Sequence, residues 1–219
     1  MVKMAVLVSG SGSNLQAIIE AVEAGRIDGE IALVVSNRPD AYGLVRAEKH
    51  GIATRVVEPG KFSERRDFDR ELARVLAEAG VELVVLAGFM RVLGSEFLSR
   101  FPDRVINIHP ALLPAFPGTH GQGDAFDYGV KLAGCTVHFV DEKVDHGPII
   151  IQAAVPVLDH DDRDALAARI LRCEHRIFPR ALALYCAGRL EIVGRKVRIS
   201  EIDENALSEQ FLISCPEIS

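Results

Sequence analysis

An amide and an imidazole lie two residues apart in the segment Asn107-Ile108-His109-Pro110. Alternate residues of an extended chain share a face, so Asn107 and His109 are expected to point together while Ile108 points into the core. Pro110 favours an extended conformation at His109, which supports this geometry. Donors of these two kinds could stabilise an oxyanion that forms at a carbonyl carbon. A lone histidine in such a place is more commonly a hydrogen-bonded residue at the end of a strand.

A polar segment, residues 141–148 (DEKVDHGP), carries several acidic side chains. A carboxylate placed near His109 would orient the imidazole and favour its protonated form. The spacing along the chain does not show whether such a contact exists. A solvated acidic turn is the alternative interpretation of this segment.

Residues 9–14 (SGSGSN) follow a short apolar run and precede a helical pattern. Glycines allow the backbone to turn sharply, and the free N–H groups at a helix start attract anions, so phosphate is the natural ligand. A dinucleotide fingerprint would have a third glycine where Leu15 stands, and an acid where Ser36 and Asn37 end the second strand. The alternative is a plain strand–helix turn capped by Ser or Asn.

Other polar residues carry weaker signals. His138 alternates with Val137 and Phe139 on a predicted strand, which favours a structural role. The run 159–162 (DHDD) is typical of an exposed loop before a helix, and no metal site is expected. The sequence has no G-x-S-x-G, H-E-x-x-H or P-loop lysine motif.

Short apolar runs alternate with helical periodicity through the first half of the chain, which predicts a Rossmann-like α/β fold with a mostly parallel sheet flanked by helices. Open sheets of this kind bind ligands at the carboxyl ends of their strands, where Asn107 and His109 would lie. The predicted strands are 4–8, 31–35, 53–57, 83–87 and 104–107. Helical patterns cover 15–22, ended by Gly25, then 41–50, then 68–76 with Gly80 beyond its end, and 90–98.

After Pro110 the pattern changes to strands that would extend the sheet in a mixed arrangement. These are the alternating run 135–140 and the apolar run 148–157. Residues 165–187 are expected to form one long helix, or a helix kinked at Pro179. A closing hairpin is predicted over 190–199.

Composition narrows the class of protein. The 219 residues, 48% of them hydrophobic, are enough for one domain with a real core. A net charge of −6 with interspersed Lys and Arg makes a nucleic-acid partner improbable. The four separated cysteines, the lack of a signal-peptide core and the lack of a membrane-length apolar run predict a cytoplasmic protein without a membrane partner.

The chain resembles the formyl-folate transferase superfamily and, within it, the phosphoribosylglycinamide formyltransferases. The N-x-H-P-x-L-L-P motif with a later D-x-G-P is specific for the superfamily, and the S-G-x-G-S-N start with no extra domain narrows it to these enzymes. The matching stretches are VLVSGSGSNLQAIIEA, VVSNRPDAYGLVRAEKHGI, FDRELA, LVVLAGFMRVL, VINIHPALLPAFPGTH, GCTVHFVDEKVDHGPIIIQ and EHRIFPRAL.

This resemblance implies transfer of a formyl group from the co-substrate 10-formyltetrahydrofolate to the amine of glycinamide ribonucleotide, in de novo purine (IMP) biosynthesis, without a metal. It implies a catalytic role for Asn107, His109 and Asp145. It implies phosphate binding by Gly12, Ser13 and Asn14, and a place near the ribonucleotide for Glu174. The residues implied in folate binding are Arg65, Met90, Arg91, Val92, Leu93, Asn107, Asp141, Glu142, Lys143 and Val144.

The same resemblance predicts one domain over 1–200, with a nucleotide-binding half (1–107), a catalytic and folate half (108–200) and a tail (201–219). Either a monomer or a homodimer is compatible with it. The chain departs from its relatives at residues 121–124 (GQGD), where a looser loop is expected, and at His146, where a small residue is usual.

Two other functions remain open at this point. A formyltetrahydrofolate deformylase, or another formyl-folate transferase such as the methionyl-tRNA formylating enzyme, would share the motifs. Those relatives usually carry a further domain. A non-catalytic nucleotide-binding module of Rossmann type would explain the glycine loop but leave Asn107, His109 and Asp145 without a role.

Overall fold

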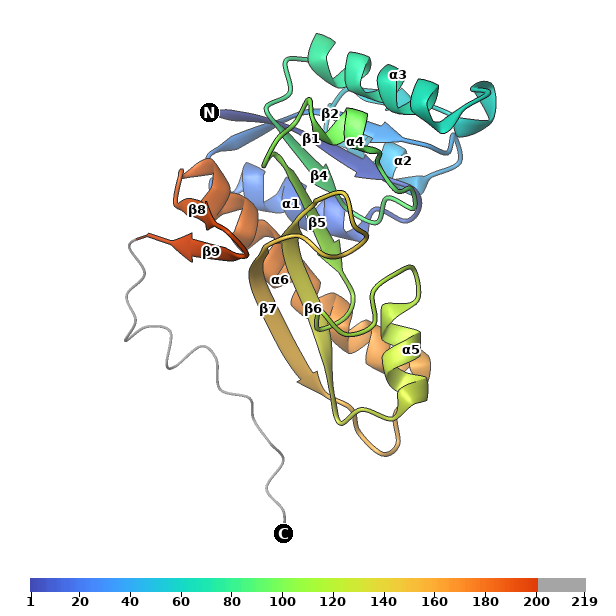
Figure 1. Cartoon of the computed structure of the whole chain (residues 1–219), viewed down its shortest axis with the longest axis vertical. Helices are drawn as coiled ribbons and strands as arrows, with labels where there is room; N and C mark the ends of the chain where they lie inside the picture. The colour runs from blue at the N-terminus through green and yellow to red at the C-terminus, as the bar shows by residue number, and fades with distance from the viewer. Residues whose placement is uncertain (201–219) are drawn as a thin grey trace.

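The computed structural model describes residues 1–200, and the predicted tail, 201–219, lies outside the described residues. Strands and helices alternate along the chain (Figure 1). The strands are β1 (Val2–Val8), β2 (Gly29–Ser36), β3 (Thr54–Val56), β4 (Leu83–Leu86), β5 (Val105–His109), β6 (Leu132–Phe139), β7 (Ile149–Pro156), β8 (Leu190–Val193) and β9 (Lys196–Ile199). The helices are α1 (Ser13–Glu23), α2 (Tyr42–Lys49), α3 (Arg65–Glu78), α4 (Ser95–Leu98), α5 (Gly121–Tyr128) and α6 (Arg163–Cys186), with a 3₁₀ turn at Pro59–Lys61.

All nine described strands form one sheet in the order β3-β2-β1-β4-β5-β6-β7-β9-β8. The first five strands pair in parallel, β6 pairs antiparallel with β5, and β7 pairs antiparallel with β6. The β8–β9 hairpin then joins the sheet through a parallel contact between β9 and β7. The predicted α/β fold, with a parallel sheet that becomes mixed after residue 110, is confirmed.

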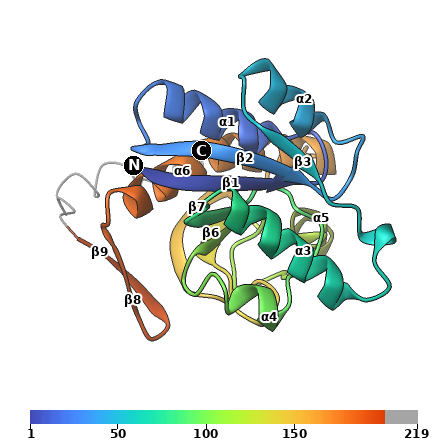
Figure 2. The same cartoon turned by 90° about the horizontal axis from the view of Figure 1, so that it is seen from above.

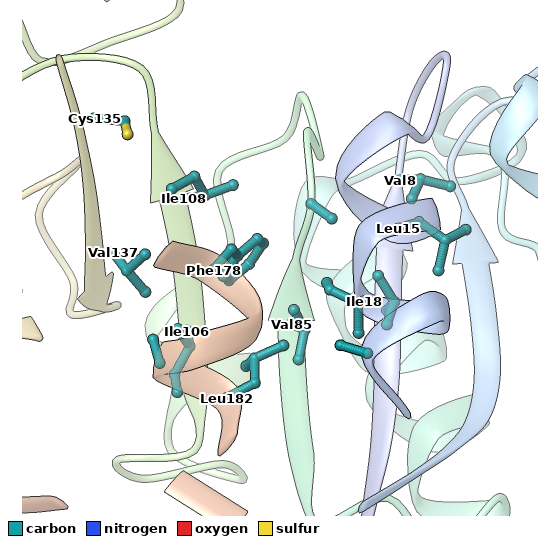
Figure 3. Packing of buried hydrophobic residues seen from close by; sticks show 14 of the residues in the cluster. Val8, Leu15, Ile18, Val85, Ile106, Ile108, Cys135, Val137, Phe178 and Leu182 are labelled. Carbon is teal, nitrogen blue, oxygen red and sulfur yellow. The ribbon is translucent and has the colours of Figure 1, made fainter. Parts of the chain in front are cut away.

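Helices cover both faces of the sheet (Figure 2). One apolar core packs α1, α2, α5 and α6 against one face, and a second packs α3 and α4 against the other. In the first core, Phe178 and Leu182 of α6 lie beside Ile106 and Ile108 of β5 (Figure 3). The strand that carries Asn107 and His109 is therefore fixed by buried packing. None of the helices in residues 1–200 combines the length and apolar character needed to cross a bilayer.

Three predictions of local structure need correction or completion. The helix predicted over 90–98 is wrong for its first part, because Gly94 is extended and α4 begins only at Ser95. Residues 121–124 were expected to form a looser loop, but they begin α5. Helix α6 continues through Pro179 to Cys186, so the single-helix alternative is the correct one.

Candidate active site

Strand β5 presents Asn107 and His109 on one face, and Ile106 and Ile108 on the other face pack into the core. His109 is almost completely buried, with 3% of its surface exposed. The alternation that follows from the extended chain thus places the amide and the imidazole together.

Asp145 lies in the 140–148 loop between β6 and β7, and this loop folds back over β5. One carboxylate oxygen, Oδ2, lies 3.4 Å from His109 Nδ1 and accepts a hydrogen bond of 2.8 Å from the Gly118 N–H. The other oxygen, Oδ1, accepts from Asn107 Nδ2 at 3.5 Å. The structure therefore brings together the three side chains that the resemblance implies in catalysis.

The environment of Asp145 keeps its carboxyl group ionised. Burial alone would raise the pKa of Asp145, but the interactions with His138, the Gly118 N–H and the charge of His109 outweigh burial and leave the pKa below its usual value. A carboxylate of this kind stays negative at neutral pH, so it can orient an imidazole and stabilise its positive charge.

The structure adds His138 to this cluster. His138 lies directly opposite Asn107 on the antiparallel neighbour β6, and its Nε2 is 3.2 Å from Asn107 Nδ2 and 3.7 Å from Asp145 Oδ1. Its Nδ1 is 2.7 Å from the carbonyl oxygen of Phe139, which can only accept. The sequence favoured a structural role for His138, because neither the register of β5 and β6 nor the position of Asp145 could be read from it.

Both ring nitrogens of His109 face hydrogen-bond acceptors. Nε2 is 2.8 Å from the carbonyl oxygen of Phe116, and Nδ1 faces the Asp145 carboxylate. This arrangement suits an imidazolium, which has a proton on each nitrogen. Nε2 is engaged with Phe116, so it can donate to a substrate oxygen only after that carbonyl moves away.

The glycine loop at residues 9–14 turns the chain from β1 into α1. Gly12 adopts a left-handed conformation (φ 68°), and a Cβ added there would lie 2.6 Å from the Cα of Gly43. No side chain caps α1, so the N–H groups of its first turn keep their capacity to bind an anion. Arg46 of α2 holds the loop through a 2.9 Å hydrogen bond from Nε to the Ser11 carbonyl.

Asn14 and Glu174 connect this loop to α6. Asn14 Nδ2 donates to Glu174 Oε2 at 2.7 Å, and Asn14 Oδ1 is buried without a partner among the described residues. Burial raises the pKa of Glu174, and the hydrogen bond from Asn14 offsets only part of that effect. A buried acceptor beside a buried carboxyl group suits a ligand that brings its own hydroxyl or N–H donors.

The segment 89–94 follows β4 and is held at both ends by buried side chains. Ser9 Oγ accepts from the Met90 N–H at 2.8 Å, and Asp69 Oδ2 accepts from the Gly94 N–H at 2.9 Å. Between these anchors Met90 and Val92 are more than half exposed. The segment therefore offers an apolar surface beside the end of β5.

The other residues implied in folate binding belong to this segment, to the start of α3 and to the 140–148 loop. Arg65, at the start of α3, is 3.8 Å from Asp69, and the Arg91 guanidinium lies over the Phe68 ring. Leu93 is buried in the second core. Asp141, Glu142, Lys143 and Val144 belong to the loop that carries Asp145, and Val144 is half exposed.

Two further features bear on the extent of the site. A groove of about 640 Å³ between β3 and α3 includes none of the residues discussed above. Among residues 1–200, no group of three or more His, Cys, Asp or Glu side chains is arranged to hold a metal ion.

Comparison with known proteins defines the class to which this fold and site belong. Residues 2–182 match the formyl transferase family, and the chain is a member of that family. It is 44% identical over 187 residues to the phosphoribosylglycinamide formyltransferase of Escherichia coli, which covers 85% of this chain and 88% of that one.

A solved structure is similar over almost the whole chain. Glycinamide ribonucleotide transformylase 1 from Symbiobacterium toebii superposes with a TM-score of 0.90 at 53% identity, over 91% of this chain and 94% of that one. The chain is also 51% identical over 188 residues to the trifunctional purine biosynthetic protein adenosine-3 of Drosophila melanogaster. It spans only 14% of the length of that relative.

Proposed function

We propose that this formyl transferase moves the formyl group of 10-formyltetrahydrofolate to the amine of glycinamide ribonucleotide in purine biosynthesis. The products would be formylglycinamide ribonucleotide and tetrahydrofolate. The observation that carries the proposal is the convergence of Asn107, His109 and Asp145 at the end of β5. In the sheet, β4 is the one strand between β5 and β1, and β1 leads into the glycine loop.

Asn107 and His109 supply the hydrogen-bond donors of the reaction. Attack of the amine on the formyl carbon places negative charge on the formyl oxygen, and donors fixed in advance stabilise that charge more than they stabilise the reactants. His109 takes part once its Nε2 leaves the Phe116 carbonyl, and Asn107 donates from its amide nitrogen once that nitrogen gives up the long 3.5 Å hydrogen bond to Asp145. No serine or cysteine in the matched motifs is needed as a nucleophile.

Asp145 has two tasks in this scheme. Its carboxylate holds His109 in place and balances the imidazolium charge. The attacking nitrogen must also lose a proton while the departing nitrogen of the folate gains one, and Asp145 would pass that proton on through water.

The ribonucleotide is expected to lie across the carboxyl ends of β1, β4 and β5. The span from β1 to β5 is two strand spacings, about 10 Å. Phosphate bound at Gly12, Ser13 and Asn14 would fix one end of the substrate, and its amine would reach His109. The unpartnered Asn14 Oδ1 and the carboxyl group of Glu174 would receive the ribose between them.

The folate is expected to bind between the 89–94 segment and the 140–148 loop. The exposed Met90 and Val92 suit the flat faces of the pterin ring, and Arg65 and Arg91 suit the carboxylates at the glutamate end of the folate. The halves 1–107 and 108–200 stay a prediction, in which Arg65, expected to contact the folate, belongs to the first half and Glu174, expected near the ribonucleotide, to the second. The cytoplasmic location, the lack of nucleic-acid and membrane partners, and a monomer or homodimer stay predictions.

A two-substrate assay tests the proposal. The purified chain is mixed with 10-formyltetrahydrofolate, and the tetrahydrofolate product is followed by absorbance with and without glycinamide ribonucleotide. Tetrahydrofolate formation that requires the ribonucleotide, with formylated ribonucleotide confirmed by mass spectrometry, is the expected result. Formate release without the ribonucleotide would instead identify a deformylase, and folate binding without turnover would identify a binding module.

A further inference from the structure

His146, which follows Asp145, is the departure from the family pattern that the proposed function leaves unexplained. Its side chain turns back along the 140–148 loop, and its Nδ1 lies 2.7 Å from Asp141 Oδ2. The second oxygen of Asp141 accepts from the Lys143 N–H at 3.0 Å. His146 and Asp141 therefore close the loop on itself around Asp145.

The β8–β9 hairpin reaches this loop from outside. It lies beyond residue 182, where the match to the formyl transferase family ends. Lys196 of β9 pairs in parallel with Ile149, the first residue of β7. Arg195, in the two-residue turn of the hairpin, thus lies beside the last residues of the 140–148 loop. The register of the added strands sets this position.

Arg195 contacts both partners of the loop closure. Its Nη1 donates a hydrogen bond of 2.5 Å to the carbonyl oxygen of His146. The same nitrogen lies 3.1 Å from His146 Nδ1 and 4.0 Å from Asp141 Oδ2. One guanidinium on a hairpin paired into the sheet thus contacts the backbone after Asp145 and faces the carboxylate before it.

The backbone at Asp145 needs such support. Its φ is +50°, in the left-handed region that residues other than glycine adopt only at some cost in free energy. The loop around it is largely exposed. Within residues 1–200, the side chain of Asp145 contacts Asn107, His109, His138 and Gly118. Contacts on the following peptide therefore help to decide where the carboxylate points.

We propose that Arg195 is a positioning residue that holds the 140–148 loop, and with it Asp145 and the residues expected to contact the folate. The role in substrate binding rests on the proposed function. Arg195 itself would not touch the reacting atoms. The hairpin thereby becomes a working part of the active site, although it lies outside the matched family region.

Arg195→Ala in the full chain tests this role, with Lys196→Ala as the matched control. Lys196 is the neighbouring exposed cation, and its substitution removes the same charge from the same hairpin. Arg195→Ala is expected to raise KM for 10-formyltetrahydrofolate about two- to ten-fold, the range for a partly exposed charged hydrogen bond. KM for glycinamide ribonucleotide should not change. Arg195→Lys should recover part of the loss, because an ammonium group can still donate to the His146 carbonyl.

Hydrogen exchange provides a readout that does not depend on turnover. In Arg195→Ala the amides of residues 141–147 should exchange faster than in the unchanged protein, while those of β1 keep their rates. Lys196→Ala should leave both regions unchanged.

Three results would overturn the proposal. They are unchanged exchange in residues 141–147, equal increases in the two KM values, and a loss of thermal stability with both KM values unchanged. An unchanged protein that does not form tetrahydrofolate would refute the proposed function instead, and the exchange comparison would still decide whether Arg195 restrains the loop.

Discussion

The glycine loop and the Asn107–His109–Asp145 cluster are built in opposite ways. The loop is expected to bind phosphate through its backbone N–H groups, and neighbouring segments hold it by close approach, with Gly12 against Gly43. The cluster uses side chains that come from β5 and from a loop more than thirty residues away. A backbone site of this kind depends on shape, whereas the cluster depends on charge and on the direction of each side chain.

This difference predicts which property of the protein a substitution in each region should change. Substitutions in the loop should alter folding or the binding of one substrate, because they change space and local charge. Substitutions in the cluster should alter the chemical step and leave the fold intact, because Asn107 and Asp145 are not part of either apolar core.

The largest effect is expected in the cluster. Asp145→Asn keeps the shape of the side chain but removes the charge that balances His109, and His109→Ala removes a donor to the developing oxyanion. Each should lower kcat about 10²–10³-fold. Steady-state kinetics measures the loss, and unchanged far-ultraviolet circular dichroism checks that the fold is retained. A kcat near that of the unchanged protein would refute these roles.

A charge placed in the loop should affect binding of one substrate. Ser13→Asp adds a carboxylate at the start of α1, where the phosphate is expected, and should raise KM for glycinamide ribonucleotide about 10–100-fold by repulsion. KM for 10-formyltetrahydrofolate should stay the same. Ser13→Asn, of similar size but neutral, serves as the control. Equal changes in the two KM values would place the phosphate elsewhere.

Filling the space between Gly12 and Gly43 should affect folding. Gly12→Ala combines a positive φ with a Cβ that would lie 2.6 Å from the Cα of Gly43, so it should lower the free energy of unfolding by about 1–3 kcal/mol. Chemical denaturation measures the change. Gly60→Ala, at a position with nothing within 4 Å, should be close to neutral. Similar stabilities for the two variants would contradict the close-packing account of the loop.

The smallest effect on stability is expected at Glu174, the buried carboxyl group that Asn14 of the glycine loop contacts. Burial raises the pKa of this carboxyl group above 4.5, so the folded state binds the proton more tightly than the unfolded state. The contribution of the Glu174 carboxyl group to the free energy of unfolding is therefore fully present below pH 4.5. It is lost as pH rises through the pKa that this group has in the folded state. Glu174→Gln should avoid this loss, and its gain in stability over the unchanged protein should appear only above pH 4.5.

Denaturant titrations at pH 4 and pH 7 measure this difference. Glu174→Gln should also raise KM for the ribonucleotide, which would show that the buried charge serves binding at the expense of stability. A gain of equal size at both pH values would mean that ionisation of Glu174 is not its cause.

Much of the fold could be predicted, because its signals are local. Apolar runs such as Val84–Leu86 mark the strands, and Gly25, Gly51 and Gly80 mark the ends of the first three helices. The alternation of Ile106, Asn107, Ile108 and His109 correctly gives the faces of β5.

Features of the structure that depend on strand register, or on contacts between residues distant in the chain, could not be predicted from local patterns. The pairing of Asn107 with His138 follows from the register between β5 and β6. The N–H of Gly94 is taken by Asp69, a residue of α3, and this contact delays the start of α4. The contact of Arg195 with the 140–148 loop requires β9 to join the sheet beside β7, which no local pattern reveals.

The most direct measurement is a double-mutant cycle on the rate of formyl transfer with His109→Ala, Asp145→Asn and the double variant. Because Asp145 acts partly through His109, the double variant should lose much less kcat than the product of the two single losses. Losses that multiply in the double variant would show that His109 and Asp145 act independently, and would contradict a shared site at the end of β5.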